Sequence, residues 1–358
     1  MAHEPPAPVG RRVAEEERRA VGSGASLDDV ARLAGVSAST ASRALNNHPQ
    51  VAAATRERVL TAAAGLDYVV SPEASRLAGG ASRTRVAVVV PHLSRWFFGR
   101  LLEGLEAGLR EGGDTAVDVL LFLVGDVAGR RAFFEHLPAR RRVDAAVVVG
   151  FEVDEAERAR LELLGVHIVS AGGPREPFPS VTVDDHRAGR QAVDHLVHLG
   201  HRRIGLLASQ DPDDRGPDLR TAAYRDALAD AGLDVDDELV VRVPFGGPGG
   251  ADGMGRLLGL RHPPTAVFAS ADEIAAGAVR TLRRAGLRVG GEISVIGVDD
   301  HPVAEMLDLT TVAQPVHEQG VVAGRMVRAL LEPGGPVPVA SQVLPTHLVL
   351  RGTTGPPP

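Results

Sequence analysis

Residues 26–46 constrain this chain most, because they carry the pattern of two short helices joined by a tight turn. Ser26 and Asp29 have the spacing of a capping box, which predicts where the first helix starts. Gly35 permits the left-handed turn that ends this helix, and Ser37 predicts the cap of a second helix. The pattern is typical of a helix-turn-helix, although an ordinary helical hairpin shares it.

The outer face of the second helix favours DNA recognition over an ordinary hairpin. At helical spacing, Ala41, Ala44 and Leu45 fall on the inner face. The outer face carries small side chains and one long cation: Ala38, Ser39, Ser42 and Arg43. Arginine to guanine is the commonest base-specific contact, so we expect Arg43 to carry much of the direct readout.

Two further helices are predicted after this pair. Residues 51–66 form the first, which closes a small core. The side chains expected inside that core are apolar residues of the first and third helices: Val30, Ala31, Leu33, Ala34, Val59, Leu60, Ala63 and Leu66. Ser71 and Pro72 predict the start of a short helix that ends at Gly79. Isolated helices need about 12–15 residues to be stable, so we expect this one to fold only when docked.

This amino-terminal pattern resembles that of the LacI/GalR (lactose-repressor) family of bacterial transcription regulators. The similarity lies in Asp29-Val-Ala-Arg-Leu-Ala-Gly-Val-Ser-x-x-Thr40, Ser42-Arg43-x-Leu-Asn46 and Thr55-Arg56-x-Arg-Val59. The resemblance implies that Leu77 wedges into the minor groove of an operator, a known way to bend DNA. The residues that it places at the DNA are Ser37, Ala38, Ser39, Thr40, Ser42, Arg43, Asn46, Thr55, Ala74 and Leu77.

From residue 86 onward, apolar strands alternate with helices, which predicts two doubly wound units over residues 86–183 and 184–312. The predicted strands are 86–90, 117–124, 143–149, 166–169, 204–207, 239–243, 266–269, 293–298 and 344–351. The predicted helices include 97–111, 184–199, 221–231 and 273–285. The glycines of Gly246-Gly-Pro-Gly-Gly250 lack the order of a nucleotide-binding motif, so this stretch is interpreted as a flexible loop.

The body also resembles the periplasmic-binding-protein-type sensor of the same family, through Asp184-x-x-x-x-Gly189, Arg220-x-x-x-Tyr224 and Ile293-Ser-Val-Ile-Gly-Val-Asp-Asp300. The resemblance implies two lobes, with the chain crossing between them near residues 315 and 345. The expected fold class is a small all-α helix-turn-helix head plus a two-lobed α/β sensor with doubly wound parallel sheets. The expected divisions are a disordered leader (1–25), the head (26–70), a hinge helix and linker (71–85), and a sensor (86–354) with an amino-terminal subdomain (86–183 and 315–344) and a carboxyl-terminal subdomain (184–314 and 345–354).

The cleft between these lobes is the expected effector site, because ligands in such folds bind at the carboxyl ends of strands. By resemblance, the residues that line it are His92, Phe98, Arg220, Phe245, Asp272, Asp299 and Gln314. A fixed cation and a carboxylate facing one cleft suit a polyhydroxylated or purine-like ligand. Two alternatives stay open, since Arg220 could be a solvated cation at a helix start and Asp299 could cap a turn.

Composition argues against several other classes of protein. The net charge of −7 argues against a nonspecific polyanion binder, and the absence of cysteine excludes disulfides and thiolate metal sites. Neither a membrane span of about 18 apolar residues nor the apolar core of a signal peptide is evident. The spacing of His195, His198 and His201 does not place three ligands on one helix face. With no nucleophile elbow, Walker A loop or H-E-x-x-H, we expect no metal, no cofactor and no enzymatic activity.

These features together predict a cytoplasmic, homodimeric transcription regulator, most simply a repressor. Its partners would be a pseudo-palindromic double-stranded DNA operator and a small-molecule effector, a carbohydrate or a derivative of one. Two alternatives remain: a solute-binding receptor without DNA function, and a co-repressor mode in which a purine-like ligand promotes DNA binding. A receptor would be exported, whereas residues 1–25 have no apolar signal-peptide core and a helix-turn-helix follows them.

Overall fold

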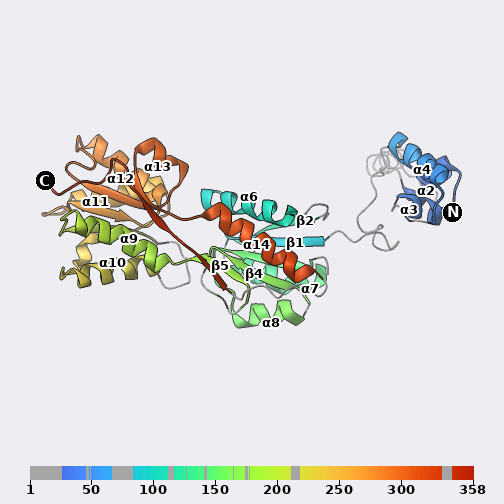
Figure 1. Cartoon of the computed structure of the whole chain (residues 1–358), viewed down its shortest axis with the longest axis horizontal. Helices are drawn as coiled ribbons and strands as arrows, with labels where there is room; N and C mark the ends of the chain where they lie inside the picture. The colour runs from blue at the N-terminus through green and yellow to red at the C-terminus, as the bar shows by residue number, and fades with distance from the viewer. Residues whose placement is uncertain are drawn as a thin grey trace, which may run out of the picture. The chain divides into compact units, whose positions relative to one another are not determined.

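The structure is a computed structural model that describes residues 26–45, 48, 50–66, 84–111, 117–125, 127–140, 143–163, 165–173, 176, 178–210, 218–332 and 341–358 (Figure 1). The chain divides into two compact units, residues 1–83 and Thr84–Pro358. The predicted leader and the predicted hinge helix, with Ala74 and Leu77, lie outside the described residues, and so does Asn46.

The first unit is a three-helix head formed by α2 (Leu27–Ala34), α3 (Ala38–Leu45) and α4 (Ala53–Gly65). Ser26 and Asp29 make the predicted capping box at the start of α2, and Gly35 ends that helix in the left-handed region with a φ of 64°. The hydroxyl of Ser37 accepts a hydrogen bond from the backbone N–H of Thr40 at 3.1 Å, as expected of a cap on α3. The predicted helix-turn-helix is therefore confirmed.

The core of the head is built largely from alanine. Val30 and Val59 are fully buried, and alanines of all three helices surround them: Ala31, Ala34, Ala41, Ala44, Ala62 and Ala63. Leu33 and Leu60, which the sequence places inside, are 60% and 50% exposed, so that part of the prediction is wrong. Helices that pack through alanine approach closely, which leaves the larger leucine side chains outside the core.

The amino-terminal lobe of the second unit is a parallel sheet in the order β11-β5-β4-β3-β1-β2. Its strands are β1 (Thr84–Val90), β2 (Val117–Leu123), β3 (Ala145–Val149), β4 (His167–Ala171), β5 (Ser180–Val183) and β11 (Ser341–Leu344). One face packs on α6 (Trp96–Arg110) and α14 (Val316–Leu331), the other on α7 (Val127–Arg140) and α8 (Glu155–Leu163). Val88 faces the first helix pair and Val89 the second, which explains why this strand is apolar throughout.

The carboxyl-terminal lobe has a second sheet in the order β12-β10-β9-β8-β6-β7, in which β12 is antiparallel to β10. Its strands are β6 (Ile204–Ser209), β7 (Val240–Val243), β8 (Ala266–Ala269), β9 (Ser294–Asp299), β10 (Thr310–Ala313) and β12 (His347–Val349). One face is covered by α9 (Asp185–His198) and α10 (Leu219–Asp230), the other by α11 (Gly247–Leu258), α12 (Asp272–Arg284) and α13 (Pro302–Leu307). A short 3-10 helix, η1 (Asp237–Leu239), leads into β7.

The chain passes from one lobe to the other between β5 and α9, between β10 and α14, and between β11 and β12 (Figure 1). Two rigid lobes joined by short strand connections can rotate against each other as a hinge. The predicted two-lobed α/β fold with parallel sheets is confirmed by this arrangement.

The stretch Gly246–Gly250 is not a flexible loop, because Gly247 begins helix α11. A Cβ atom on Gly249 would lie 1.8 Å from the carbonyl oxygen of Pro244, and one on Gly250 would lie 1.9 Å from that of Ile274 in α12. The glycines are thus needed for close backbone packing against α12 and the preceding turn. Tertiary contact stabilises this helix despite the low helix propensity of glycine.

Helices α6 and α14 of the amino-terminal lobe also pack backbone to backbone. A Cβ atom on Gly104 of α6 would lie 1.9 Å from the carbonyl oxygen of His317 in α14. Conversely, a Cβ atom on Gly320 would lie 2.1 Å from the carbonyl oxygen of Leu101. Because α14 is the element that re-enters this lobe from the other, the glycine contact fixes one end of an interlobe connection.

Two of the three histidines near the end of α9 hold the carboxyl terminus of the chain. Nε2 of His201 lies 2.9 Å from the carbonyl oxygen of Gly355, and Nδ1 lies 2.9 Å from the hydroxyl of Thr265. Nε2 of His195 lies 3.0 Å from the hydroxyl of Thr354. These partners, which include no second imidazole, account for His195 and His201 as structural residues.

Burial lowers the pKa of His201 below its ordinary value of 6.5, so the folded state favours the neutral ring. As the pH falls through 6.5, the imidazole of His201 takes up a proton in the unfolded chain but stays neutral in the folded one. The stabilising contribution of His201 is therefore complete above pH 6.5 and declines below it. We expect the chain to melt at a higher temperature than His201→Gln at pH 7.5, and this difference to shrink at pH 5.5. A difference that grows on acidification would contradict the neutral assignment.

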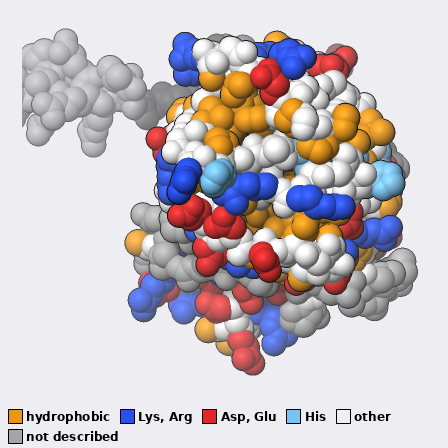
Figure 2. Space-filling model, turned by 90° about the vertical axis from the view of Figure 1, so that its left-hand side faces the viewer, with side chains coloured by type: hydrophobic (Ala, Val, Ile, Leu, Met, Phe, Trp, Pro, Cys, Tyr) orange, Lys and Arg blue, Asp and Glu red, His pale blue; other side chains and the backbone are white. Residues whose placement is uncertain are grey.

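Figure 2 looks onto the end of the carboxyl-terminal lobe, where apolar side chains gather in a band across the upper half and acidic ones lie mainly below. Met306 of α13 is 84% exposed, and Leu350, after β12, is 65% exposed. Exposed apolar patches of this kind mark surfaces that contact other proteins. In the described part of the chain, no helix is long and apolar enough to cross a membrane.

Candidate functional site

A cleft of about 450 Å³ opens between the two lobes, at the carboxyl ends of their strands. The amino-terminal lobe contributes residues that follow β1, β3 and β4: Pro91, His92, Arg95, Phe97, Phe98, Gly150, Phe151, Gly172 and Gly173. The carboxyl-terminal lobe contributes residues at or after the ends of its strands and at the start of α10: Ser209, Asp218, Arg220, Phe245, Ser270, Ala271, Asp299 and Gln314. The cleft thus lies where the sequence predicts an effector site.

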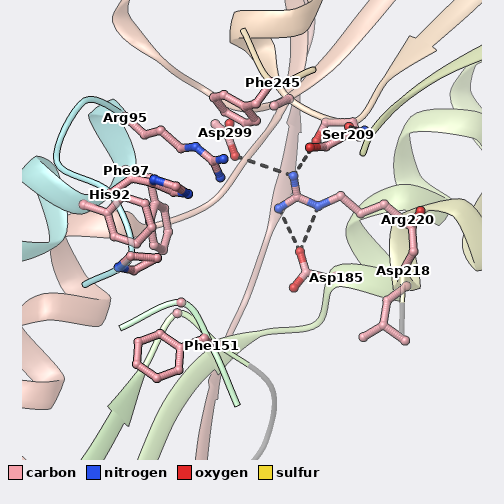
Figure 3. A pocket seen from close by; sticks show the side chains of 18 of the residues that line it. His92, Arg95, Phe97, Phe151, Asp185, Ser209, Asp218, Arg220, Phe245 and Asp299 are labelled. Carbon is pink, nitrogen blue, oxygen red and sulfur yellow. Dashed lines mark hydrogen bonds and ion pairs between the residues drawn. The ribbon is translucent and has the colours of Figure 1, made fainter. Parts of the chain in front are cut away.

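The guanidinium of Arg220 is held by hydrogen bonds and an ion pair, so Arg220 is not a solvated cation at a helix start. Its Nε and Nη2 atoms contact Oδ1 of Asp185 at 2.9 and 2.8 Å, and Nη1 donates to the carbonyl oxygen of Ser270 (Figure 3). Nη1 also lies 3.9 Å from Oδ1 of Asp299. The side chain is 20% exposed, so its guanidinium is a fixed, oriented donor at the wall of the cleft.

Asp299 ends β9 with a φ of 129°, a backbone conformation that residues other than glycine rarely adopt. Its Oδ1 atom accepts a hydrogen bond from Nε2 of Gln314 at 2.6 Å, and the residue is 8% exposed. Burial raises the pKa of Asp299 to about 6, while the guanidinium of Arg220 and the amide of Gln314 act against that rise. The side chain therefore takes part in a network across the cleft wall.

Asp272, which the sequence places in the effector site, does not reach the cleft. It is fully buried, and its carboxyl oxygens accept hydrogen bonds from the hydroxyl of Thr311 at 2.7 Å and from the backbone N–H of His301 at 2.9 Å. Burial and the neighbouring carboxyl of Asp299 raise the pKa of Asp272 to about 8. Asp272 therefore holds the turn that follows Asp299 in place from below the cleft wall.

The opposite wall of the cleft is aromatic. Phe97 and Phe98, at the start of α6, meet edge to face with ring centroids 5.4 Å apart, and Phe151 follows β3. The guanidinium carbon of Arg95 lies 4.0 Å from the centroid of the Phe245 ring, which belongs to the other lobe (Figure 3). Aromatic faces opposite fixed hydrogen-bonding groups can bind a molecule that has one apolar face and a polar rim.

Of the predicted effector residues, the structure brings His92, Phe98, Arg220, Phe245, Asp299 and Gln314 to the cleft. Sequence reasoning missed several lining residues that lie on loops, at helix starts or, for Arg242, within β7: Arg95, Phe97, Phe151, Asp185, Asp218 and Arg242. Their positions in the sequence could have indicated them, because most of them lie just after a predicted strand or near the start of the next helix. What the sequence lacked was the direction of each side chain.

In the head, the outer face of α3 is accessible. Ser37, Ser39 and Arg43 are exposed, whereas Ala38, Thr40 and Ser42 are half-buried. Thr55 lies half-buried in the first turn of α4. Two other arginines fasten the fold instead: the guanidinium of Arg56 donates to the carbonyl of His48, and that of Arg58 donates to the carbonyl of Ala34. Within the described part of the head, Arg43 makes no ion pair and is available to a partner.

A helix-turn-helix head joined to a two-lobed α/β body with a ligand-sized cleft defines a ligand-sensing, DNA-binding regulator. Residues 26–71 match the model of the bacterial regulatory proteins, lacI family, and residues 193–354 match that of a periplasmic binding protein-like domain. The chain belongs to the LacI family of transcription regulators.

Relatives and solved structures agree with this assignment over more than nine-tenths of the chain. The HTH-type transcriptional regulator DegA of Bacillus subtilis is 32% identical over 342 residues, which cover 92% of this chain and 97% of DegA. The Lac repressor dimer bound to operator and an anti-inducer superposes with a TM-score of 0.76 at 28% identity, covering 93% of this chain and all of that one. The CelR–cellobiose complex gives 0.65 at 31% identity, covering 92% and 99%.

Proposed function

We propose that this protein is a repressor whose affinity for an operator is set by a small molecule bound in the cleft. The observation that carries the proposal is the ligand-sized cleft at the strand ends, walled by both lobes, in the same chain as an accessible recognition helix. A molecule that touches both walls favours one angle between the lobes over others. Because operator DNA lies in the bacterial cytoplasm, the protein would act there, and we assign it no catalytic role.

The charges of the cleft favour a neutral, hydroxyl-rich effector over a phosphorylated one. Its three arginines face four carboxylates, and these pair locally: Arg220 with Asp185, and Arg242 with Asp218 at 3.2 Å. Among the described lining residues, carboxylates thus outnumber arginines, so the cleft has no excess positive charge to attract a phosphate. Aromatic rings opposite paired polar groups suit a sugar, which has apolar C–H faces and a rim of hydroxyls, and the related CelR structure holds cellobiose.

The repressor would bind as a homodimer, in which two heads enter successive major grooves about 34–36 Å apart. The Lac repressor structure that this chain resembles is a dimer on its operator. The apolar band at the end of the carboxyl-terminal lobe offers a surface for a second copy. The roles of Asn46, Ala74 and Leu77 rest on the family resemblance alone.

Replacing Arg43 by alanine is expected to weaken operator binding by about 1–3 kcal/mol and to relax the preference at one base position. The physical reason is that Arg43 is exposed on α3 and can donate two hydrogen bonds to one guanine. Arg32 of α2, paired with Asp29 at 3.0 Å, is the charge-matched control. Arg32→Ala should lower affinity at most uniformly across sequences, so equal base preferences in both variants would refute the role of Arg43. Binding is measured by fluorescence anisotropy on single-base operator variants.

The function itself is tested in two steps with the full-length protein. Selection from a random duplex pool should enrich a pseudo-palindromic site, and a thermal-shift screen of sugars, sugar phosphates and nucleosides should give its largest shift with a neutral sugar. A response to nucleosides alone would support the purine-like alternative. Failure to enrich any sequence would remove the regulatory function.

A further inference from the structure

Arg95, the N-cap of α6, and Trp96, its first residue, reach across from the amino-terminal lobe to the carboxyl-terminal lobe. Arg95 lies over the ring of Phe245, with its guanidinium carbon 4.0 Å from the ring centroid. The Trp96 and His301 rings meet edge to face, with centroids 5.0 Å apart and planes at 61°. Figure 3 shows Arg95 and Phe245 side by side at one edge of the cleft.

Phe245 and His301, the partners of these two residues, are themselves fixed by contacts within the carboxyl-terminal lobe. Phe245 follows β7 and packs against the core of its lobe. His301 is the N-cap of α13, where its Nδ1 atom accepts a hydrogen bond from the backbone N–H of Val303 at 2.9 Å. Arg95 additionally acts to lower the pKa of Glu273 in α12, against the larger effect of burial, which raises it. Two neighbouring residues of one lobe thus contact two separate segments of the other, the residues after β7 and the start of α13.

We propose that Arg95 and Trp96 form a clasp that holds the two lobes together across the cleft. A cation over an aromatic face and an edge-to-face ring pair are short-range contacts, so a few ångströms of opening removes both. The cation–aromatic contact alone shifts a closed-to-open ratio by about 2- to 30-fold. The clasp therefore determines which angle between the two lobes predominates.

Arg95 also lines the cleft, so the clasp is exposed to whatever binds there. An occupant that takes the face of Phe245 displaces the guanidinium and opens the clasp, whereas one that fits beneath the pair keeps it shut. This part of the proposal rests on the effector role proposed above. The clasp itself requires neither an effector nor an operator, and it can be tested without them.

Trp96 is the sole tryptophan of the chain, so tryptophan fluorescence reports directly on this contact. We expect Arg95→Gln to raise the acrylamide quenching constant of the full-length, ligand-free protein about two-fold or more, because an open clasp exposes the indole. His301→Asn should do the same, since asparagine can keep the N-cap hydrogen bond of α13 while removing the ring. The matched control is Arg100→Gln, because Arg100 lies on α6 and pairs at 2.6 Å with Glu103 of the same helix.

A quenching constant that rises in the two clasp variants and stays unchanged in Arg100→Gln supports the clasp. A constant that stays at the unmodified value in either clasp variant overturns it, and so does an equal rise in the control. Circular dichroism melts confirm that each variant is folded, and the His301 variant decides the question if Arg95→Gln does not fold. Neither DNA nor ligand is present, so a negative result here leaves the regulatory function standing.

Discussion

Replacing Asp299 by asparagine is expected to abolish the response to the effector while leaving operator binding intact. The carboxylate is nearly buried at the cleft wall, where it accepts from Gln314 and faces the guanidinium of Arg220 at 3.9 Å. A hydrogen bond to a charged group contributes about 1.5–3 kcal/mol, so loss of this carboxylate should lower effector affinity by about 10-fold or more. The head that contacts DNA belongs to a separate compact unit and should be unaffected.

The measurement is the thermal shift produced by the ligand that stabilises the unmodified chain, together with operator affinity. Asp300→Asn is the matched control, because it makes the same change one residue later. Asp300 pairs with Arg351 at 2.7 Å and does not line the cleft. We expect the control to keep both the thermal shift and the operator response. A normal shift in Asp299→Asn would remove this residue from the site.

The second large effect is expected from Gly104→Ala, which should destabilise the amino-terminal lobe by about 3 kcal/mol or more. The added methyl would lie 1.9 Å from the carbonyl oxygen of His317, and both groups belong to helix backbones that cannot rotate away. Gly99, on the same helix, has nothing within 4 Å of the place where its Cβ would lie. Gly99→Ala should therefore stabilise the protein by about 0.5–1 kcal/mol, through helix propensity alone.

The free energy of unfolding of both variants is measured by urea denaturation of the full-length protein. Glycine to alanine at these two positions of one helix should change that free energy in opposite directions, lowering it at Gly104 and raising it at Gly99. Two equal effects would mean that α6 and α14 do not pack backbone to backbone, and that helix propensity governs both positions.

Sequence reasoning succeeded where structure is determined locally. The box formed by Ser26 and Asp29, the turn at Gly35 and the cap at Ser37 involve neighbours in the chain, so the helices of the head could be located without tertiary information. The apolar runs of the strands could likewise be recognised, because strands buried on both faces have little sequence freedom.

The failures concern contacts between distant segments. The glycines at 247–250 predict a loop by propensity, yet close packing against α12 makes them a helix. Leu60 fits the periodicity of an inner face, but alanines bring the helices too close to admit it. In the cleft, Asp299 and Arg220 could be proposed from their places at a strand end and a helix start. Whether Asp272 points into the cleft or beneath it depends on Thr311 and His301, which no local pattern reveals.

Titration of the selected operator duplex with the full-length protein, without and with the stabilising ligand, tests the central claim most directly. Anisotropy of a labelled duplex gives both affinities in one experiment, including whether the ligand weakens or strengthens binding. We expect the ligand to change operator affinity by about 5- to 150-fold, the range typical of coupled sites, and to leave the affinity of the Asp299→Asn variant unchanged. Equal affinities of the unmodified chain with and without ligand, or no preference for the selected site over random duplex, would contradict it.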